Sequence, residues 1–132
     1  MRIVLDTNVI VSALLNPSGP PASVLNLALR RSVTLLIDNR ILFEYSDVLH
    51  REKFSFPRHA VDGLLDFFKG CAQFITPSPT SVKLPDEDDR PFYEVAVSAD
   101  ADFLVTANKS HFPRKRTIVT PKQFLDIETQ GK

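Results

Sequence analysis

Residues 3–8, Ile-Val-Leu-Asp-Thr-Asn, are the stretch of sequence that decides the fold. The run Ile3–Leu5 is short and wholly apolar, which is typical of a parallel strand covered on both faces. Asp6 ends this run, so its carboxylate is expected at the carboxyl end of the strand. A pattern of helical spacing over residues 8–15 follows at once. The chain therefore begins as a strand followed by a helix.

The rest of the chain continues this alternation. Asp38 or Asn39 can cap a helix, and Thr120-Pro121 is a good start for the last one. The predicted helices cover residues 22–31, 39–51, 60–68 and 89–99, and the predicted strands cover 33–37, 71–75, 102–106 and 117–119. Parallel strands need crossover helices that pack on the sheet. The sequence thus predicts an α/β fold, a three-layer α/β/α sandwich with a mostly parallel central sheet.

Composition sets limits on the class of protein. The chain has 132 residues, of which 43% are hydrophobic and 24% charged, so we expect one domain over residues 1–132 with its own core. The apolar stretch over residues 9–15 is too short to span a membrane. A secretory signal would need a cationic segment before this stretch, but the acidic Asp6 stands there. We therefore expect a cytoplasmic protein. Cys71 is predicted to be an inert thiol buried in a strand.

Three carboxylates stand where an ordinary fold does not need them. Asp6 lies at a strand end, although capping the next helix would explain it equally well. Glu44 falls on or beside the apolar face of its helix, and an edge position that reaches water is the simpler explanation. Asp89 faces the sheet at the start of a helix, where the helix dipole alone would favour it. Sites in parallel sheets lie at the carboxyl ends of the strands, so these side chains can converge there.

Converging carboxylates repel one another unless a hard cation neutralises them, and oxygen ligands select Mg²⁺ or Mn²⁺. The alternatives are weak. One cysteine and three scattered histidines offer no zinc-ligand spacing. The chain has only four glycines, and no phosphate-binding loop or nucleophile elbow is present in it. The remaining chemistry is metal-assisted hydrolysis.

Four segments together resemble the PIN domain family over essentially the whole chain. They are residues 5–8 (LDTN), the helix that carries Glu44, residues 86–89 (DEDD) and residues 101–109 (ADFLVTANK). The resemblance implies that Asp6, Glu44 and Asp89 hold the metal, with Asp88 as the alternative third ligand. Thr7, Asn8 and Thr106 would be nearby polar support.

One position departs from the family pattern. PIN domains generally carry a fourth acid just after the threonine of the late strand, and that position is Asn108 here. An amide keeps an oxygen ligand but removes a charge. A second metal should therefore bind more weakly, or Asp86, Asp88 or Asp102 must contribute instead.

The resemblance is closest to the branch of toxins related to VapC-type ribonucleases of toxin–antitoxin pairs. It implies an endoribonuclease that uses Mg²⁺ or Mn²⁺, with an antitoxin partner and a homodimeric state. Sixteen basic residues balance sixteen acidic ones, so local charge must hold the RNA backbone. The candidate RNA-binding residues are Arg90, Lys109, Arg114, Lys115 and Arg116. Phe54 and Phe56 are the best candidates for exposed stacking side chains.

Two other classes compete with the nuclease. The first is a PIN-like module that binds RNA or protein but is catalytically weak or silent because of Asn108; metal affinity separates it from a nuclease. The second is a receiver-type domain that is phosphorylated near Asp6. That class places its phosphorylated aspartate on a later strand and leaves Glu44 unexplained, so it ranks below the others.

Overall fold

The structure, a computed structural model, describes residues 1–130. Its strands are β1 (Arg2–Leu5), β2 (Thr34–Ile37), β3 (Gln73–Phe74), β4 (Phe103–Val105) and β5 (Ile118–Val119). Its α-helices are α1 (Thr7–Leu15), α2 (Pro20–Leu29), α3 (Asn39–Leu49), α4 (Arg58–Cys71), α5 (Arg90–Ser98) and α6 (Pro121–Gln130). Three short 3-10 helices are η1 (Glu52–Phe54), η2 (Glu87–Asp89) and η3 (Lys109–His111).

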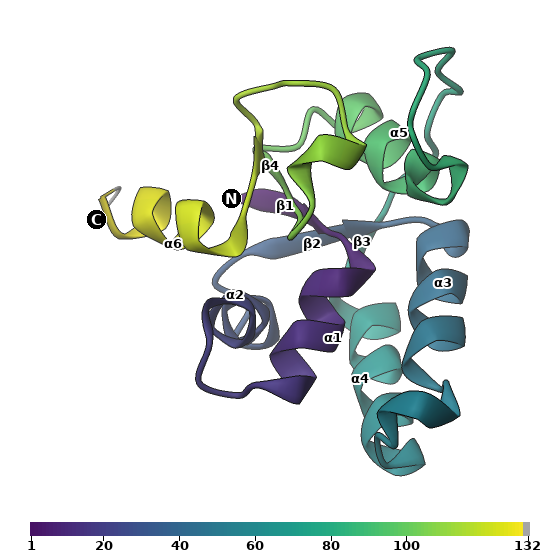
Figure 1. The fold of residues 1–132 in the computed structure, drawn as a ribbon, viewed down its shortest axis with the longest axis vertical. Helices are drawn as coiled ribbons and strands as arrows, with labels where there is room; N and C mark the ends of the chain where they lie inside the picture. Colours follow the sequence, from purple (N-terminus) through teal and green to yellow (C-terminus); the bar gives the residue numbers. More distant parts are fainter. Residues whose placement is uncertain (131–132) are drawn as a thin grey trace.

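The five strands form one sheet in the order β3-β2-β1-β4-β5, and every pairing is parallel. β1 occupies the centre, with Ile3 paired to Leu35 on one side and to Phe103 on the other. Figure 1 shows α5 on one side of the sheet and α1 and α2 on the opposite side. The predicted α/β/α sandwich is confirmed. The central position of β1 explains why its residues Ile3–Leu5 are apolar and almost wholly buried.

α3 connects the central sheet to the site described below. Asp38 follows β2 and caps the helix, accepting a hydrogen bond from the Ile41 amide at 2.9 Å. Ile41 and Tyr45 are fully buried on the sheet side of the helix. The Tyr45 hydroxyl donates to the Leu5 carbonyl at 2.6 Å, which ties α3 to the end of β1. Helical spacing and the cap together fix which face of α3 meets the sheet.

Some local predictions were wrong. Cys71 ends α4 instead of lying in a strand, and it is half-buried, with its sulfur accepting a hydrogen bond from the Arg31 guanidinium at 3.0 Å. The strand that follows contains two residues, because Phe68 is buried and keeps α4 helical to Cys71. Within residues 1–130, no helix is long and apolar enough to cross a membrane.

Candidate functional site

Asp6 lies where β1 ends and α1 begins, and only 6% of it is exposed. No side-chain cap hydrogen bond joins its carboxylate to the helix, although the backbone amides of Thr7 and Asn8 are close enough to lower its pKa. Its Oδ2 atom accepts a hydrogen bond from the hydroxyl of Thr106 at 2.7 Å. Thr106 follows β4, the strand beside β1, and is fully buried. Two adjacent strand ends therefore meet at this carboxylate.

Glu44 reaches the same edge of the sheet from α3. The Thr7 hydroxyl, at the first residue of α1, donates to Glu44 Oε2. Thr7 is only 5% exposed, so this contact lies below the surface. The second turn of α3 thus brings Glu44, which the sequence placed on or beside the apolar face of its helix, to the start of α1.

Asp89 is the residue that directly precedes α5, and its side chain is 14% exposed. Its Oδ2 atom lies 3.0 Å from Nδ1 of His111, which belongs to η3 after β4. His111 Nε2 lies 2.9 Å from Nδ2 of Asn108. His111 was not predicted as a site residue. The sequence signal was its place in the loop that follows the Thr106 strand, although the 22-residue separation from Asp89 concealed the contact.

The three carboxylates influence one another electrostatically. Burial raises the pKa of Asp6 to about 6, and the nearby charge of Asp89 adds to the increase while the Thr106 hydroxyl opposes it. Burial likewise raises the pKa of Glu44, opposed by Thr7 and reinforced by Asp6 and Asp88. Burial also raises the pKa of Asp89, opposed by His111. Mutual repulsion in a buried place is what a bound cation would relieve.

The donor set fits a hard divalent cation, because every candidate ligand is a carboxylate. In each, one oxygen accepts a hydrogen bond, from Thr106, Thr7 and His111 in turn. Within residues 1–130, no side chain donates a hydrogen bond to the other oxygen of any of the three, while the backbone amides of Thr7 and Asn8 also face Asp6. As the side chains lie, no three His, Cys, Asp or Glu in that range are close enough to hold a metal. Binding would therefore draw the carboxylates closer together.

The predicted polar support residues surround these acids. Asn8 Oδ1 accepts a hydrogen bond from the Ala107 amide at 3.3 Å, which joins α1 to the segment after β4. The Asn108 amide donates to the Thr106 hydroxyl at 3.0 Å, so Thr106 is held while it donates to Asp6. These contacts fix the positions of two carboxyl-end segments relative to each other.

The other acids considered from the sequence lie in different places. Asp88 is exposed, and its charge acts on Glu44, so it borders the site. Asp86 caps η2 by accepting a hydrogen bond from the Asp88 amide at 2.9 Å. Asp102 precedes β4 and accepts a hydrogen bond from the Arg2 backbone amide at 2.7 Å. It therefore lies at the amino ends of the strands, opposite the site. Asp102 therefore cannot replace the fourth acid.

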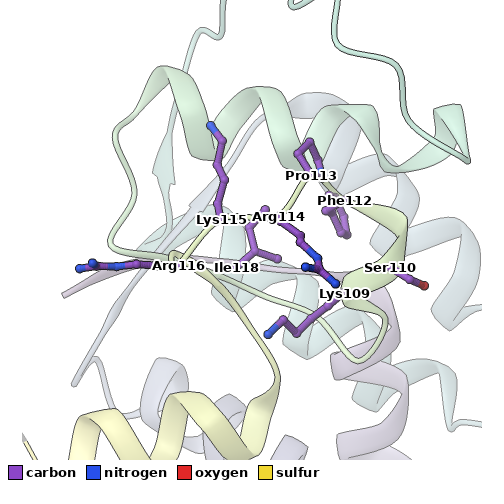
Figure 2. Close-up of a pocket in the computed structure, with 8 residues that line it drawn as sticks. All are labelled: Lys109, Ser110, Phe112, Pro113, Arg114, Lys115, Arg116 and Ile118. Carbon is purple, nitrogen blue, oxygen red and sulfur yellow. The ribbon is translucent and has the colours of Figure 1, made fainter.

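A basic hollow of about 830 Å³ is lined by residues that follow Asn108 in the sequence. Its lining includes Lys109, Arg114, Lys115 and Arg116, together with Phe112 and Ile118. In Figure 2, Lys109 and Arg114 extend over the hollow, whereas the guanidinium of Arg116 extends away from them. The Lys115 ammonium lies 5.2 Å from the centre of the Tyr93 ring of α5. The hollow begins at Lys109, directly after Asn108.

Arg90 has a different role from the one suggested by the sequence. Its guanidinium donates to the carbonyls of Thr80 and Val82 at 2.9 and 2.7 Å, and it pairs with Glu87. These contacts brace the proline-containing loop against α5. Arg90 is thus engaged in structure and does not line the basic hollow.

The predicted aromatic candidates, Phe54 and Phe56, stack on each other with ring centres 5.4 Å apart. Both are half-buried. They follow the end of α3 that is remote from Asp38, and therefore lie away from the acidic edge. Base stacking near the acids cannot come from this pair.

Comparisons with known proteins agree with this arrangement. A family model described as PIN domain matches residues 2–110. An uncharacterized protein of Methanocaldococcus jannaschii, MJ1680, is 26% identical in an alignment 140 residues long, and the alignment covers 96% of this chain and 90% of that protein. Among solved structures, VapBC2 from Rickettsia felis, crystallised bound to a DNA fragment from their promoter, matches with a TM-score of 0.55. That match has 19% identity and covers 91% of this chain and 97% of the other.

Proposed function

The chain belongs to the PIN domain family, and we propose that it is an endoribonuclease that hydrolyses RNA phosphodiester bonds with Mg²⁺ or Mn²⁺. PIN domains are generally nucleases. The observation that carries the proposal is that Asp6, Glu44 and Asp89 come from three segments to the carboxyl ends of the strands, where they influence one another electrostatically and each is held by one side-chain hydrogen bond. A receiver-type domain, the other fold considered from the sequence, would leave Glu44 unexplained.

These three carboxylates would hold the ion, with Asp88 beside them. When bound, a divalent ion polarises the scissile phosphate and activates a water for attack. The chain's own contribution is orientation: Thr106 and Thr7 each hold one oxygen of a carboxylate, so less entropy is lost when the ligands are brought together. No protein nucleophile is required.

The substrate would approach along the basic hollow. Lys109, Arg114, Lys115 and Arg116 give a local excess of positive charge in a chain that is neutral as a whole. Cations that contact phosphates position the strand without reading its sequence. Lys109, which lines the hollow, directly follows Asn108 in the chain. An RNA backbone bound in the hollow would therefore lead toward the acids.

The resemblance to VapC-type ribonucleases and the structural match to VapBC2 support a further part of the proposal. The protein would be the toxin of a toxin–antitoxin pair, bound by an antitoxin in the cytoplasm. A homodimer is also expected from the resemblance. Size-exclusion chromatography with light scattering would measure the oligomeric state of the purified chain.

The experiment is cleavage of a mixed RNA pool by the purified protein with Mg²⁺ or Mn²⁺, compared with EDTA. Asp6→Asn removes one ligand charge at nearly constant volume and should abolish cleavage while the fold is kept. Asp102→Asn is the matched control, because it changes the same residue type at the opposite sheet edge. Cleavage that persists in EDTA or in Asp6→Asn would overturn the proposal.

The second candidate is a PIN-like module that binds RNA or protein without efficient catalysis. Asn108 at the fourth-acid position and the open spacing of the three carboxylates favour it. Calorimetry separates the two candidates. RNA binding that persists without any heat from Mg²⁺ or Mn²⁺ would replace the nuclease with the binding module.

A further inference from the structure

A chain of hydrogen bonds runs around the acidic edge from Asp6 to Asp89. The Thr106 hydroxyl donates a hydrogen bond to the Asp6 carboxylate and accepts one from the backbone amide of Asn108. The Asn108 side chain contacts His111, and His111 contacts Asp89. Residue 108 is therefore not simply a missing ligand. It lies in the middle of a connection between two of the proposed metal ligands.

The donors and acceptors in this chain assign the proton on His111. Ser110 Oγ donates to Asn108 Oδ1 at 2.8 Å. The side-chain nitrogen of Asn108, Nδ2, then faces His111 Nε2 at 2.9 Å. That nitrogen only donates, so Nε2 must accept. Nδ1 then carries the hydrogen and donates to the Asp89 carboxylate at 3.0 Å. An aspartate at position 108 would have no hydrogen to offer Nε2.

We propose that His111 is a positioning residue that orients Asp89 toward the metal, and that Asn108 fixes the histidine in its Nδ1–H tautomer. The proposal rests on the proposed function and deepens it. His111 holds one oxygen of Asp89 and leaves the other for the ion. Asp6 and Glu44 are held in the same way by Thr106 and Thr7. His111 thus completes a set in which every ligand has one fixed oxygen.

Two substitutions at position 111 separate this role from direct ligation. The side-chain nitrogen of asparagine lies near the place of Nδ1, and that of glutamine near the place of Nε2. His111→Asn should therefore keep the hydrogen bond to Asp89, whereas His111→Gln should lose it. Mn²⁺ binding without RNA, measured by calorimetry, should weaken about 10–100-fold in His111→Gln and less in His111→Asn. His59→Gln, an exposed histidine on α4, is the control and should bind as the wild type does.

The wild-type protein provides an independent measurement. Nitrogen-15 spectra of its histidine rings at pH 8, without metal, should show His111 protonated at Nδ1 and unprotonated at Nε2. A proton on Nε2 would overturn the assignment. Mn²⁺ affinities that are equal in both position-111 variants and the wild type, or that are retained only by His111→Gln, would overturn the positioning role. Wild-type protein that binds no Mn²⁺ would instead refute the proposed function itself.

Discussion

Removing the charge of Asp6 should make the metal-free protein more stable while it destroys the site. Folding raises the pKa of this carboxyl from 3.8 to about 6, chiefly through burial. Its charged form is therefore disfavoured in the folded state. At a pH above 6 this shift corresponds to about 3 kcal/mol of lost stability, at about 1.4 kcal/mol for each factor of ten in the equilibrium.

Asp6→Asn would recover most of that loss. Its amide oxygen can still accept from Thr106, but the buried NH₂ group must find an acceptor, which costs about 1 kcal/mol. The net expectation is a free energy of unfolding higher by about 2 kcal/mol at pH 7.5 in EDTA. With a urea m value of about 2 kcal/mol/M, the unfolding midpoint should rise by roughly 1 M.

The pH dependence has a definite sign. A carboxyl with a raised pKa in the folded state stabilises the fold while protonated, so the wild type loses stability as the pH rises from about 4 to about 6. The advantage of Asp6→Asn should therefore grow over this interval, and near pH 4 the variant should instead be less stable than the wild type by the cost of its NH₂ group, about 1 kcal/mol. Urea denaturation followed by circular dichroism measures it. A variant less stable than the wild type at pH 7.5 would refute the reasoning.

Three further results are expected. Tyr45→Phe should lower the free energy of unfolding by about 1–3 kcal/mol in urea denaturation, because it leaves the buried Leu5 carbonyl without its donor. Burial would raise the pKa of Glu94, but hydrogen bonds from the Thr80 backbone amide and Arg40 outweigh burial and lower that pKa. Charged Glu94 therefore stabilises the fold at a pH above its ordinary pKa, so Glu94→Gln should destabilise the protein at pH 7 and much less at pH 3 in urea denaturation. Arg114→Gln should reduce the slope of log affinity against log salt by about 0.7 in filter binding to single-stranded RNA.

The central fold followed from local patterns in the sequence. Ile3–Leu5 is uniformly apolar because β1 has a strand on each side and helices on both faces. Once β1 was placed, the carboxyl-end rule put Asp6 where sites form in parallel sheets, and the family resemblance added Thr106 beside it. The cap at Asp38 and the spacing of Ile41 and Tyr45 defined α3 in the same way. These predictions depended on periodicity and chain direction, which the sequence records directly.

The errors arose where tertiary contacts decide the outcome. Cys71 was assigned to a strand from the residues beside it, yet α4 extends to this residue, with Phe68 of the same helix packed in the core. Charge alone could not tell that Arg90 would brace a loop through backbone carbonyls. Nor could spacing reveal that η3 turns His111 back toward Asp89. These positions stay ambiguous until the packing of distant segments is known.

The place of β4 beside β1 also affects the order of events during protein synthesis. Asp6 is made before its hydroxyl partner on Thr106, which lies 100 residues farther along the chain. β1 can pair with β2 early, whereas its other edge stays open until residues 103–105 have emerged. In a growing chain, the proposed metal site therefore stays incomplete until β4 and Thr106 have been made and have left the ribosome. A ribosome making this protein would be exposed to the complete proposed site only after that point.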